Sequence, residues 1–535
     1  EMVKYLNDIL ITDAAMKGDE IPTSKFLDFA DGLIPAGTAA FEKRGIAIDV
    51  PLWIADNCIQ CNLCAYSCPH GVIRPFALSD ADAKAAGGIT LQSKANGDFR
   101  FMISVSTVNC TGCGSCVDVC PAKEKALKMI PYEDERSAAQ QKVFEYANDH
   151  TDERILDGNR ENPRNIGFIK PLLEFSGACP GCGEPPYAKL VTQLFGDRMF
   201  IANATGCSSI WGGSAPSTPY TINREGRGPA WSNSLFEDNA EFGLGMAISM
   251  KTRRNEMRSA VKRLADKKAF HKEATEWIEA MDDDRVAELA AAKLISVCSG
   301  SDNDDAKFVM NNRDLLPKPS MWIFGGDGWA YDIGYGGLDH VIASGENVNI
   351  LVFDTEVYSN TGGQASKATP AGAIAQFAAS GKTVGKKNLA EIAMSYGYVY
   401  VAQVAMGANP SQTLAALREA ESYNGPSIVI AYSPCINHGI RAGMNCSMNE
   451  MKKAVQSGYW NLFRFDPRRT ANGQNPLMLD SKKPTLEYND FLKGEVRYRA
   501  LEQTNPKRAK QLFAEAAKQA NDRYETLVKR SKMDK

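Results

Sequence analysis

Between residues 198 and 434, short apolar runs alternate with stretches of helical periodicity. Five runs have almost no polar interruption: RMFIANAT (198–205), MWIFGGDG (321–328), VNILVFDT (348–355), VYVAQVAM (399–406) and SIVIAYSP (427–434). Helical patterns occupy residues 328–344, 389–397 and 409–423. Continuous apolar strands suit a parallel sheet that is covered on both faces. The alternation therefore predicts an α/β fold with a doubly wound parallel sheet, whose ligands bind at the carboxyl ends of the strands.

Outside this region the polarity pattern changes. Residues 251–294 combine helical spacing with many charges, which predicts either a projecting arm at a subunit contact or a surface hairpin. The stretch ADAKAAGGITLQSKANGDFRF (81–101) predicts a helix–turn–strand excursion on the surface. The segment 491–530 predicts helices that are interrupted at Asn505–Pro506.

Composition narrows the class of protein. The chain has 535 residues, of which 44% are hydrophobic and 23% are charged, as in an ordinary globular protein with a core. A net charge of −3 argues against a nucleic-acid binder. No apolar run reaches the length of about 18 residues that a membrane span needs, and no secretory signal is visible, so we expect no membrane association and a cytoplasmic protein. The chain begins with Glu1, and we expect a piece of a longer polypeptide.

Fourteen cysteines are many for a chain without a secretion signal, and grouped cysteines then indicate metal ligands. The runs CIQCNLCAYSCP (58–69) and CTGCGSCVDVCP (110–121) both have the spacing C-x2-C-x2-C-x3-C-P, which is typical of two-cluster bacterial ferredoxins. The fourth cysteine of each run is expected to bind the other cluster. The predicted ligand sets are Cys58, Cys61, Cys64 with Cys120, and Cys110, Cys113, Cys116 with Cys68. Zinc is the alternative, although it usually takes pairs of C-x2-C knuckles.

A third cysteine motif, CPGCGE (179–184), has no complete ligand set nearby. Cys179 and Cys182 are compatible with half of a zinc site, a redox dithiol or half of an iron–sulfur ligand set. Cys207, in the motif GCSSIWGG (206–213), follows an expected strand, where small residues allow close approach by a ligand. By itself Cys207 is better explained as a buried structural cysteine.

Two expected strand ends carry features of a diphosphate site. Gly326, Asp327 and Gly328 end one strand and begin a helix, where backbone N–H groups favour an anion and a carboxylate can bind the accompanying cation. The next strand ends in DTEVYSNTGGQ (354–364), which offers Thr355, Val357 and Asn360. A plain glycine turn is the alternative for the first motif, but the pair resembles a thiamine diphosphate fingerprint.

Together with the motifs GRGPAWSNSLFEDNAEFG (226–243) and SPCINHG (433–439), these features resemble the C-terminal half of the pyruvate:ferredoxin oxidoreductase family. The resemblance implies a third 4Fe–4S cluster on Cys179, Cys182, Cys207 and Cys435. It places Glu184 and Cys207 beside thiamine, and Mg²⁺ on Asp327, Thr355 and the carbonyl of Val357. It assigns the catalytic role near the substrate to Asn360. The implied cofactor-binding residues are Glu184, Cys207, Gly326, Asp327, Gly328, Trp329, Thr355, Glu356, Val357, Tyr358, Ser359 and Asn360.

The same resemblance divides the chain into units. The expected units are a lead-in at 1–50, a ferredoxin-like α+β domain at 51–135, a linker at 136–170, a thiamine diphosphate-binding domain at 171–475 and a helical tail at 476–535. The implied activity is oxidative decarboxylation of pyruvate to acetyl-CoA and CO₂, with ferredoxin or flavodoxin as electron acceptor and a homodimeric enzyme. Pyruvate and coenzyme A are expected to be bound largely by the N-terminal half of the family's polypeptide. Another 2-oxo acid as substrate, or a pure electron-transfer module, are the alternatives.

Overall fold

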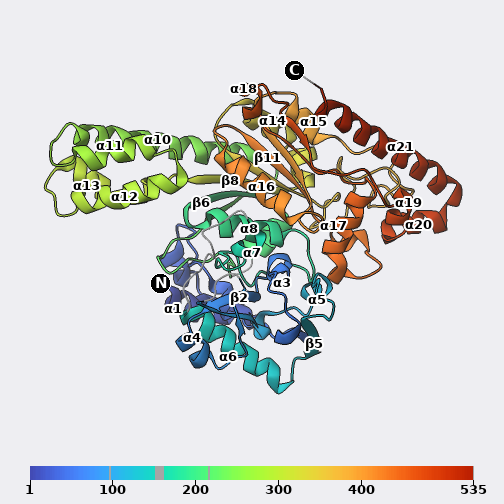
Figure 1. Ribbon diagram of the computed structural model, residues 1–535, viewed down its shortest axis with the longest axis horizontal. Helices are drawn as coiled ribbons and strands as arrows, with labels where there is room; N and C mark the ends of the chain where they lie inside the picture. The colour runs from blue at the N-terminus through green and yellow to red at the C-terminus, as the bar shows by residue number, and fades with distance from the viewer. Residues whose placement is uncertain (95–97, 151–161, 215–216, 534–535) are drawn as a thin grey trace.

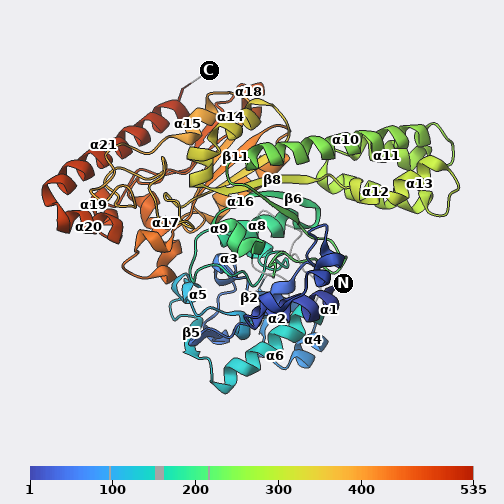
Figure 2. The same cartoon turned by 180° about the vertical axis from the view of Figure 1, so that it is seen from behind.

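The computed structural model describes residues 1–94, 98–150, 162–214 and 217–533. Figure 1 shows three parts: a cysteine-rich part at the bottom, a part built on a large sheet above it, and a helical arm that projects to one side. The view from behind in Figure 2 shows the same arrangement, with the arm free of the cysteine-rich part. The sheet part therefore lies between the arm and the C-terminal helices.

The cysteine-rich part is built on two small antiparallel sheets. Strand β1 (Asp49–Trp53) pairs with β5 (Leu127–Pro131), and β4 (Arg100–Val105) lies between β2 (Ile73–Leu78) and β3 (Leu91–Gln92). The helices here are α3 (Leu63–Ser67), α4 (Asp80–Ala86), α5 (Ser115–Asp118) and α6 (Glu135–His150). The expected surface excursion at 81–101 forms α4 and the short strand β3, which are both largely exposed, and only its last residue, Phe101, is buried in β4.

The segments that flank this part are ordered against it. In the lead-in, α1 (Met2–Tyr5) and α2 (Ile11–Ala14) accompany a small apolar cluster around Tyr5 and Leu10. In the expected linker, α6 packs against β4, and α7 (Pro163–Ile166) packs against α3. Residues 151–161 lie outside the described residues. The unit boundaries therefore stay predictions.

The large sheet has the strand order β13-β12-β10-β11-β9-β8-β6-β7. Its strands are β6 (Met199–Ala204), β7 (Ala230–Ser234), β8 (Ser320–Gly326), β9 (Asn349–Asp354), β10 (Tyr400–Val404), β11 (Ser427–Tyr432), β12 (Phe463–Phe465) and β13 (Leu477–Leu479). The five predicted strands form its parallel centre, as expected. At one edge of the sheet, β12 and β13 add two antiparallel strands to this parallel centre. Both are too short to show a pattern, and β7 is polar and half exposed.

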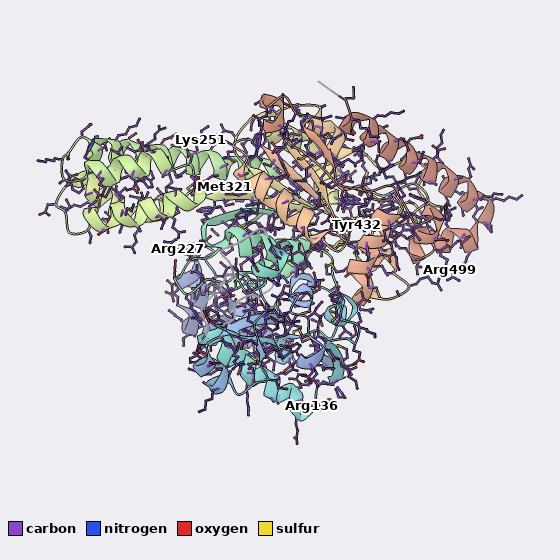
Figure 3. All side chains as sticks on the ribbon, viewed as in Figure 1. Arg136, Arg227, Lys251, Met321, Tyr432 and Arg499 are labelled. Atoms are coloured by element: carbon purple, nitrogen blue, oxygen red, sulfur yellow. The ribbon has the colours of Figure 1, made fainter. Side chains whose placement is uncertain are left out.

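Helices cover this sheet where the pattern predicted them. The region 328–344 divides at Gly334 into a short π-helix (Gly328–Ile333) and α14 (Tyr335–Ala343). Helix α15 (Leu389–Met394) packs on β10, and α16 (Pro410–Ser422) packs on β10 and β11. The other helices around the sheet are α8 (Pro185–Phe195), α9 (Cys207–Ser209), α17 (Ser447–Gln456) and α18 (Arg468–Ala471). In Figure 3, Tyr432 marks the end of β11, where it is fully buried.

The charged stretch 251–294 belongs to a projecting arm rather than a simple surface hairpin (Figures 1 and 2). The arm consists of α10 (Asn239–Ala265), α11 (His271–Ala280), α12 (Asp284–Cys298) and α13 (Asp304–Asn311). It has its own apolar core, in which Trp277 is fully buried and donates a hydrogen bond to the Leu316 carbonyl at 3.1 Å. Cys298 lies in the same core, where burial raises the pKa of its thiol to about 11.

The C-terminal segment packs on the sheet part. It contains α19 (Tyr488–Leu492), α20 (Val496–Thr504) and α21 (Pro506–Ser531). The Asn505 side chain accepts a hydrogen bond from the Arg508 N–H and so caps α21, at the predicted interruption. Within the described residues, no helix combines the length and the apolar character that crossing a membrane requires.

Candidate cofactor and iron–sulfur sites

The loops at the carboxyl ends of β6, β8 and β9 enclose a cavity of about 110 Å³. Of the residues predicted to bind thiamine diphosphate, all except Glu356 line it. The lining residues are Glu184, Thr205, Gly206, Cys207, Ser208, Phe236, Gly326, Asp327, Gly328, Trp329, Thr355, Val357, Tyr358, Ser359, Asn360 and Thr361. Three loops that are distant in sequence therefore meet at one place, as the edge of a parallel sheet requires.

Three oxygen atoms at the cavity have the spacing of a Mg²⁺ ligand set. The Thr355 hydroxyl lies 2.9 Å from Oδ1 of Asp327 and 3.1 Å from the Val357 carbonyl oxygen. Neighbouring ligands of an octahedral ion at about 2.1 Å are separated by about 3.0 Å. The side chain of Asp327 is completely buried, and its Oδ2 accepts a hydrogen bond from Ser366 at 2.6 Å. The two measured spacings are therefore compatible with oxygen ligands that share one octahedral ion.

The charge of Asp327 is poorly compensated by the protein alone. Burial and the neighbouring Asp354 raise the pKa of Asp327 to about 8. Asp354 has a cation of its own, because Lys386 Nζ lies 2.7 Å from its carboxylate. A divalent cation next to Asp327 would provide the missing positive charge.

Glu184 is a buried carboxyl group at the wall of the cavity. It lies at the start of α8, and Trp211 Nε1 donates a hydrogen bond to Oε2 at 2.8 Å. Burial raises the pKa of Glu184 to about 7, and the bond from Trp211 opposes this shift only in part. A carboxyl group in this state can hold or release a proton near neutral pH.

Glu356 differs from the other predicted cofactor residues, because its side chain points away from the cavity. Its carboxylate lies 2.7 Å from Arg497 and 3.0 Å from Lys386, and Tyr459 also donates a hydrogen bond to it. The backbone of Glu356 is in the left-handed region with φ of 62°, which is costly for a residue other than glycine. Only its backbone can contribute to the cavity wall, between the two ligands Thr355 and Val357.

The four cysteines assigned by resemblance to a third cluster come together beside the cavity. Burial raises the pKa of Cys182, Cys207 and Cys435. Glu184 and other cysteines of the same set lie close enough to raise the pKa of each further, which shows that these side chains are neighbours. The Gly183 N–H donates a hydrogen bond to the Pro434 carbonyl at 3.0 Å, which joins the CPGC loop to the end of β11. Cys207 also lines the cavity, so the two candidate sites share a residue.

The ferredoxin-like cysteines form the two predicted sets. Burial raises the pKa of Cys61 and Cys64, and Cys58 and Cys120 are among the neighbours that raise it further. Burial and the nearby Cys113 and Cys68 raise the pKa of Cys110 to about 12, and Cys116 has the same neighbours. Such thiols resist ionisation unless a metal replaces the proton.

Within the described residues, no three or more His, Cys, Asp or Glu side chains converge on one point where a metal ion would fit. In a 4Fe–4S cluster each thiolate binds a different iron. The preference for clusters over zinc therefore rests on the spacing of the cysteines in the sequence.

The third cysteine set lies close to the set that contains Cys68. The backbone of Gly181, between Cys179 and Cys182, is near enough to the Cys113 thiol to lower its pKa against the effect of burial. Three residues before Cys179, the Ser176 carbonyl accepts a hydrogen bond from the His70 ring at 3.0 Å, and the Ser176 hydroxyl donates one to the Pro69 carbonyl at 3.1 Å. Burial lowers the pKa of His70 to about 4, so its ring is neutral.

Several residues at the site escaped the sequence analysis. Ser366 binds Asp327, and Lys386 and Arg497 hold Glu356, yet none of them belongs to a motif. The serine and the lysine both lie in the glycine-containing stretch 361–386, directly after the Asn360 loop, and this position is the only sequence signal for them. Cys446, left over from the ligand sets, lies 3.5 Å from Asp118, away from the cavity.

Comparisons with known proteins agree with this architecture. Residues 57–124 match a family model described as a 4Fe-4S dicluster domain, and residues 306–431 match a C-terminal thiamine pyrophosphate-binding domain. Residues 1–47 match a domain of unknown function. The chain is 52% identical over 544 aligned residues to "Pyruvate:ferredoxin oxidoreductase" of Moorella thermoacetica, covering 99% of this chain and 46% of the relative.

The chain belongs to the pyruvate:ferredoxin oxidoreductase family. It is also 51% identical to a "Pyruvate-flavodoxin oxidoreductase" of Klebsiella pneumoniae, over 98% of this chain and 45% of that protein. A "Pyruvate dehydrogenase [NADP(+)], mitochondrial" of Euglena gracilis is 45% identical over 98% of this chain and 29% of its own length. The chain thus spans less than half the length of these relatives. The fold class predicted from the sequence is confirmed.

Proposed function

We propose that this chain is the cofactor-binding part of an enzyme that oxidises pyruvate to acetyl-CoA and CO₂ and passes electrons to ferredoxin or flavodoxin. The observation that carries the proposal is the shared position of Cys207, which belongs both to the four-cysteine set and to the cavity with the Mg²⁺-type ligand set. The names of the relatives support pyruvate as substrate. Coenzyme A, the dimer and the cytoplasmic location belong to the same proposal.

The residues present would hold the cofactors as follows. Asp327, Thr355 and the Val357 carbonyl would bind Mg²⁺ and, through it, the diphosphate. The three cysteine sets would hold three 4Fe–4S clusters. When bound, thiamine diphosphate supplies an electron sink for the loss of CO₂ from a 2-oxo acid, and the clusters accept the electrons one at a time.

Three side chains at the cavity would assist the reaction. Glu184 can hold or release a proton at the cavity wall, because the pKa of its carboxyl group is raised to about 7 by burial. Asn360 lines the same cavity and would orient the substrate with its amide. The Ser359 hydroxyl contacts both the Thr355 hydroxyl, at 2.7 Å, and the Cys435 thiol, and so couples the metal loop to the cysteine set.

The proximity of Gly181 to Cys113 indicates how the three sets are arranged. The set with Cys68, Cys110, Cys113 and Cys116 lies near the third set, whereas the set with Cys58 is more exposed. The Cys68 set would therefore hold the cluster between the other two, and the Cys58 set would hold the cluster that is more accessible to an acceptor protein.

The decisive experiment is to assemble the chain anaerobically with iron, sulfide, Mg²⁺ and thiamine diphosphate, and to measure bound iron and thiamine. We expect about twelve irons, the number for three 4Fe–4S clusters, and one thiamine per chain. The variant Cys435→Ala should retain about eight irons, whereas Cys446→Ala should retain all of them. About eight irons in the unaltered chain would refute the third cluster.

Thiamine binding separates this function from the alternative of a pure electron-transfer module. If the assembled chain contains iron but binds no thiamine diphosphate at millimolar Mg²⁺, the electron-transfer module is the better explanation. Because the relatives are more than twice as long as this chain, we expect the activity itself to require the remainder of such a polypeptide. Turnover of pyruvate by the isolated chain would contradict that expectation.

A further inference from the structure

Lys189 is a buried cation that connects the sheet part to the cysteine-rich part. It lies on α8, and only 3% of its surface is exposed. Its Nζ donates a hydrogen bond to the Cys68 carbonyl at 2.8 Å and another to the Ala65 carbonyl. One of these carbonyls belongs to Cys68, and the other belongs to the residue after Cys64. The ammonium group therefore lies between two cysteine sets, although it comes from a different part of the chain.

No carboxylate compensates this charge within the part of the chain that the structure describes. Burial lowers the pKa of Lys189 to about 8, and the groups that raise it again are the cysteines Cys68 and Cys64. Arg74 lies nearby and adds repulsion. A buried ammonium group with only neutral carbonyl partners is costly, because it leaves water without gaining an opposite charge. Thiolates bound to clusters would supply that charge.

We propose that Lys189 is a positioning residue for electron transfer, whose ammonium group is the counter-charge of the two ferredoxin-like clusters and raises their reduction potentials. The proposal rests on the proposed function, since it requires that these cysteines hold clusters. Reduction adds one electron to a cluster that already carries negative thiolates, and Lys189 neither gains nor loses a proton. A nearby cation stabilises the more negative form.

The effect is expected to be larger for the cluster that includes Cys68. That cysteine provides the carbonyl that accepts the hydrogen bond from Nζ at 2.8 Å. The same cluster lies near the third set, where Gly181 approaches Cys113. A raised potential there favours the passage of electrons out of the third cluster, so Lys189 would make the first transfer between clusters more favourable.

The test uses the full chain with assembled clusters and two variants. Lys189→Gln keeps a hydrogen-bond donor but removes the charge, whereas Lys189→Arg keeps the charge. Redox titrations at pH 7, followed by electron paramagnetic resonance, give the potential of each cluster. For Lys189→Gln we expect the equilibrium constant for one-electron reduction of the Cys68 cluster to fall about tenfold, or about 59 mV, with a smaller fall for the Cys58 cluster.

The variants also show which outcome contradicts the proposal. Lys189→Arg should have potentials close to those of the unaltered chain. Unchanged potentials in Lys189→Gln, or equal shifts in both variants, would assign Lys189 a packing role only. If Lys189→Gln fails to assemble clusters while Lys189→Arg succeeds, the requirement for a positive charge is supported, and failure of both overturns it. Thiamine binding should be normal in both variants, and an unaltered chain without clusters would refute the proposed function instead.

Discussion

The ion pairs behind the metal loop predict a stability effect that can be measured without cofactors. Arg497 lies 2.7 Å from Glu356 and 2.7 Å from Glu495, and at most 2% of each of these side chains is exposed. The variant Arg497→Gln would remove the cation paired with Glu495 and one of the two cations paired with Glu356. Removing one partner of a buried ion pair costs about 3–5 kcal/mol. Lys386 still binds Glu356, so we expect about 3 kcal/mol in the free energy of unfolding.

The loss should depend on pH in a defined direction. Burial would raise the pKa of Glu356, but Lys386 and Arg497 lower it to about 2. The ion pairs of Glu356 therefore stabilise the fold at pH values above the ordinary pKa of a glutamate side chain. Burial raises the pKa of Glu495 to about 7, even though Arg497 opposes the shift. Without Arg497, both carboxyl groups bind protons more readily in the folded chain. The loss in the free energy of unfolding caused by Arg497→Gln should therefore be larger at pH 7 than at pH 4.5.

Thermal unfolding of the sheet part, followed by circular dichroism at both pH values, measures this difference. A loss of about 3 kcal/mol corresponds to a fall in Tm of about 6–12 °C for a domain of this size. Arg499→Gln is a matched control on the same helix, because Arg499 lies at the edge of the molecule (Figure 3). Equal Tm values for Arg497→Gln and the control, or a larger deficit at pH 4.5, would refute the reasoning. A fall in Mg²⁺ affinity should accompany the loss, because the strained backbone of Glu356 lies between the two ligands.

Three further predictions concern the cavity, the third cysteine set and the arm. A methyl group at Gly183 would lie 2.6 Å from the Pro434 nitrogen, so Gly183→Ala should lose about four irons, whereas Gly177→Ala, with its nearest contact at 3.7 Å, should lose none. Asp327→Asn should weaken thiamine diphosphate binding at least tenfold in calorimetry, and a chelator of Mg²⁺ should have the same effect on the unaltered chain; binding that is indifferent to both would exclude the metal. Trp277→Ala should destabilise the arm by about 3–5 kcal/mol and increase hydrogen exchange there, while iron content and thiamine binding remain normal.

The sequence by itself determined the features that depend on local spacing. The ferredoxin-like runs identified eight cysteines, because each run must wrap a cluster within a few residues. Five apolar runs identified the parallel centre of the large sheet, since a strand buried on both faces leaves a continuous signal. Asp327 and Thr355 were found because parallel strands end at one edge, where consecutive loops meet.

Only the tertiary structure decided which distant residues meet. Strands β12 and β13 have three residues each and no periodicity, so their antiparallel pairing is visible only in the folded sheet. Cys435 reaches the CPGC loop through the bond between Gly183 and Pro434, which no spacing encodes. Lys189 and Arg497 look like ordinary helix charges in the sequence. Their burial against partners more than 100 residues away, Cys68 for Lys189 and Glu356 for Arg497, appears only in the fold, and the energy of a charge depends on these surroundings.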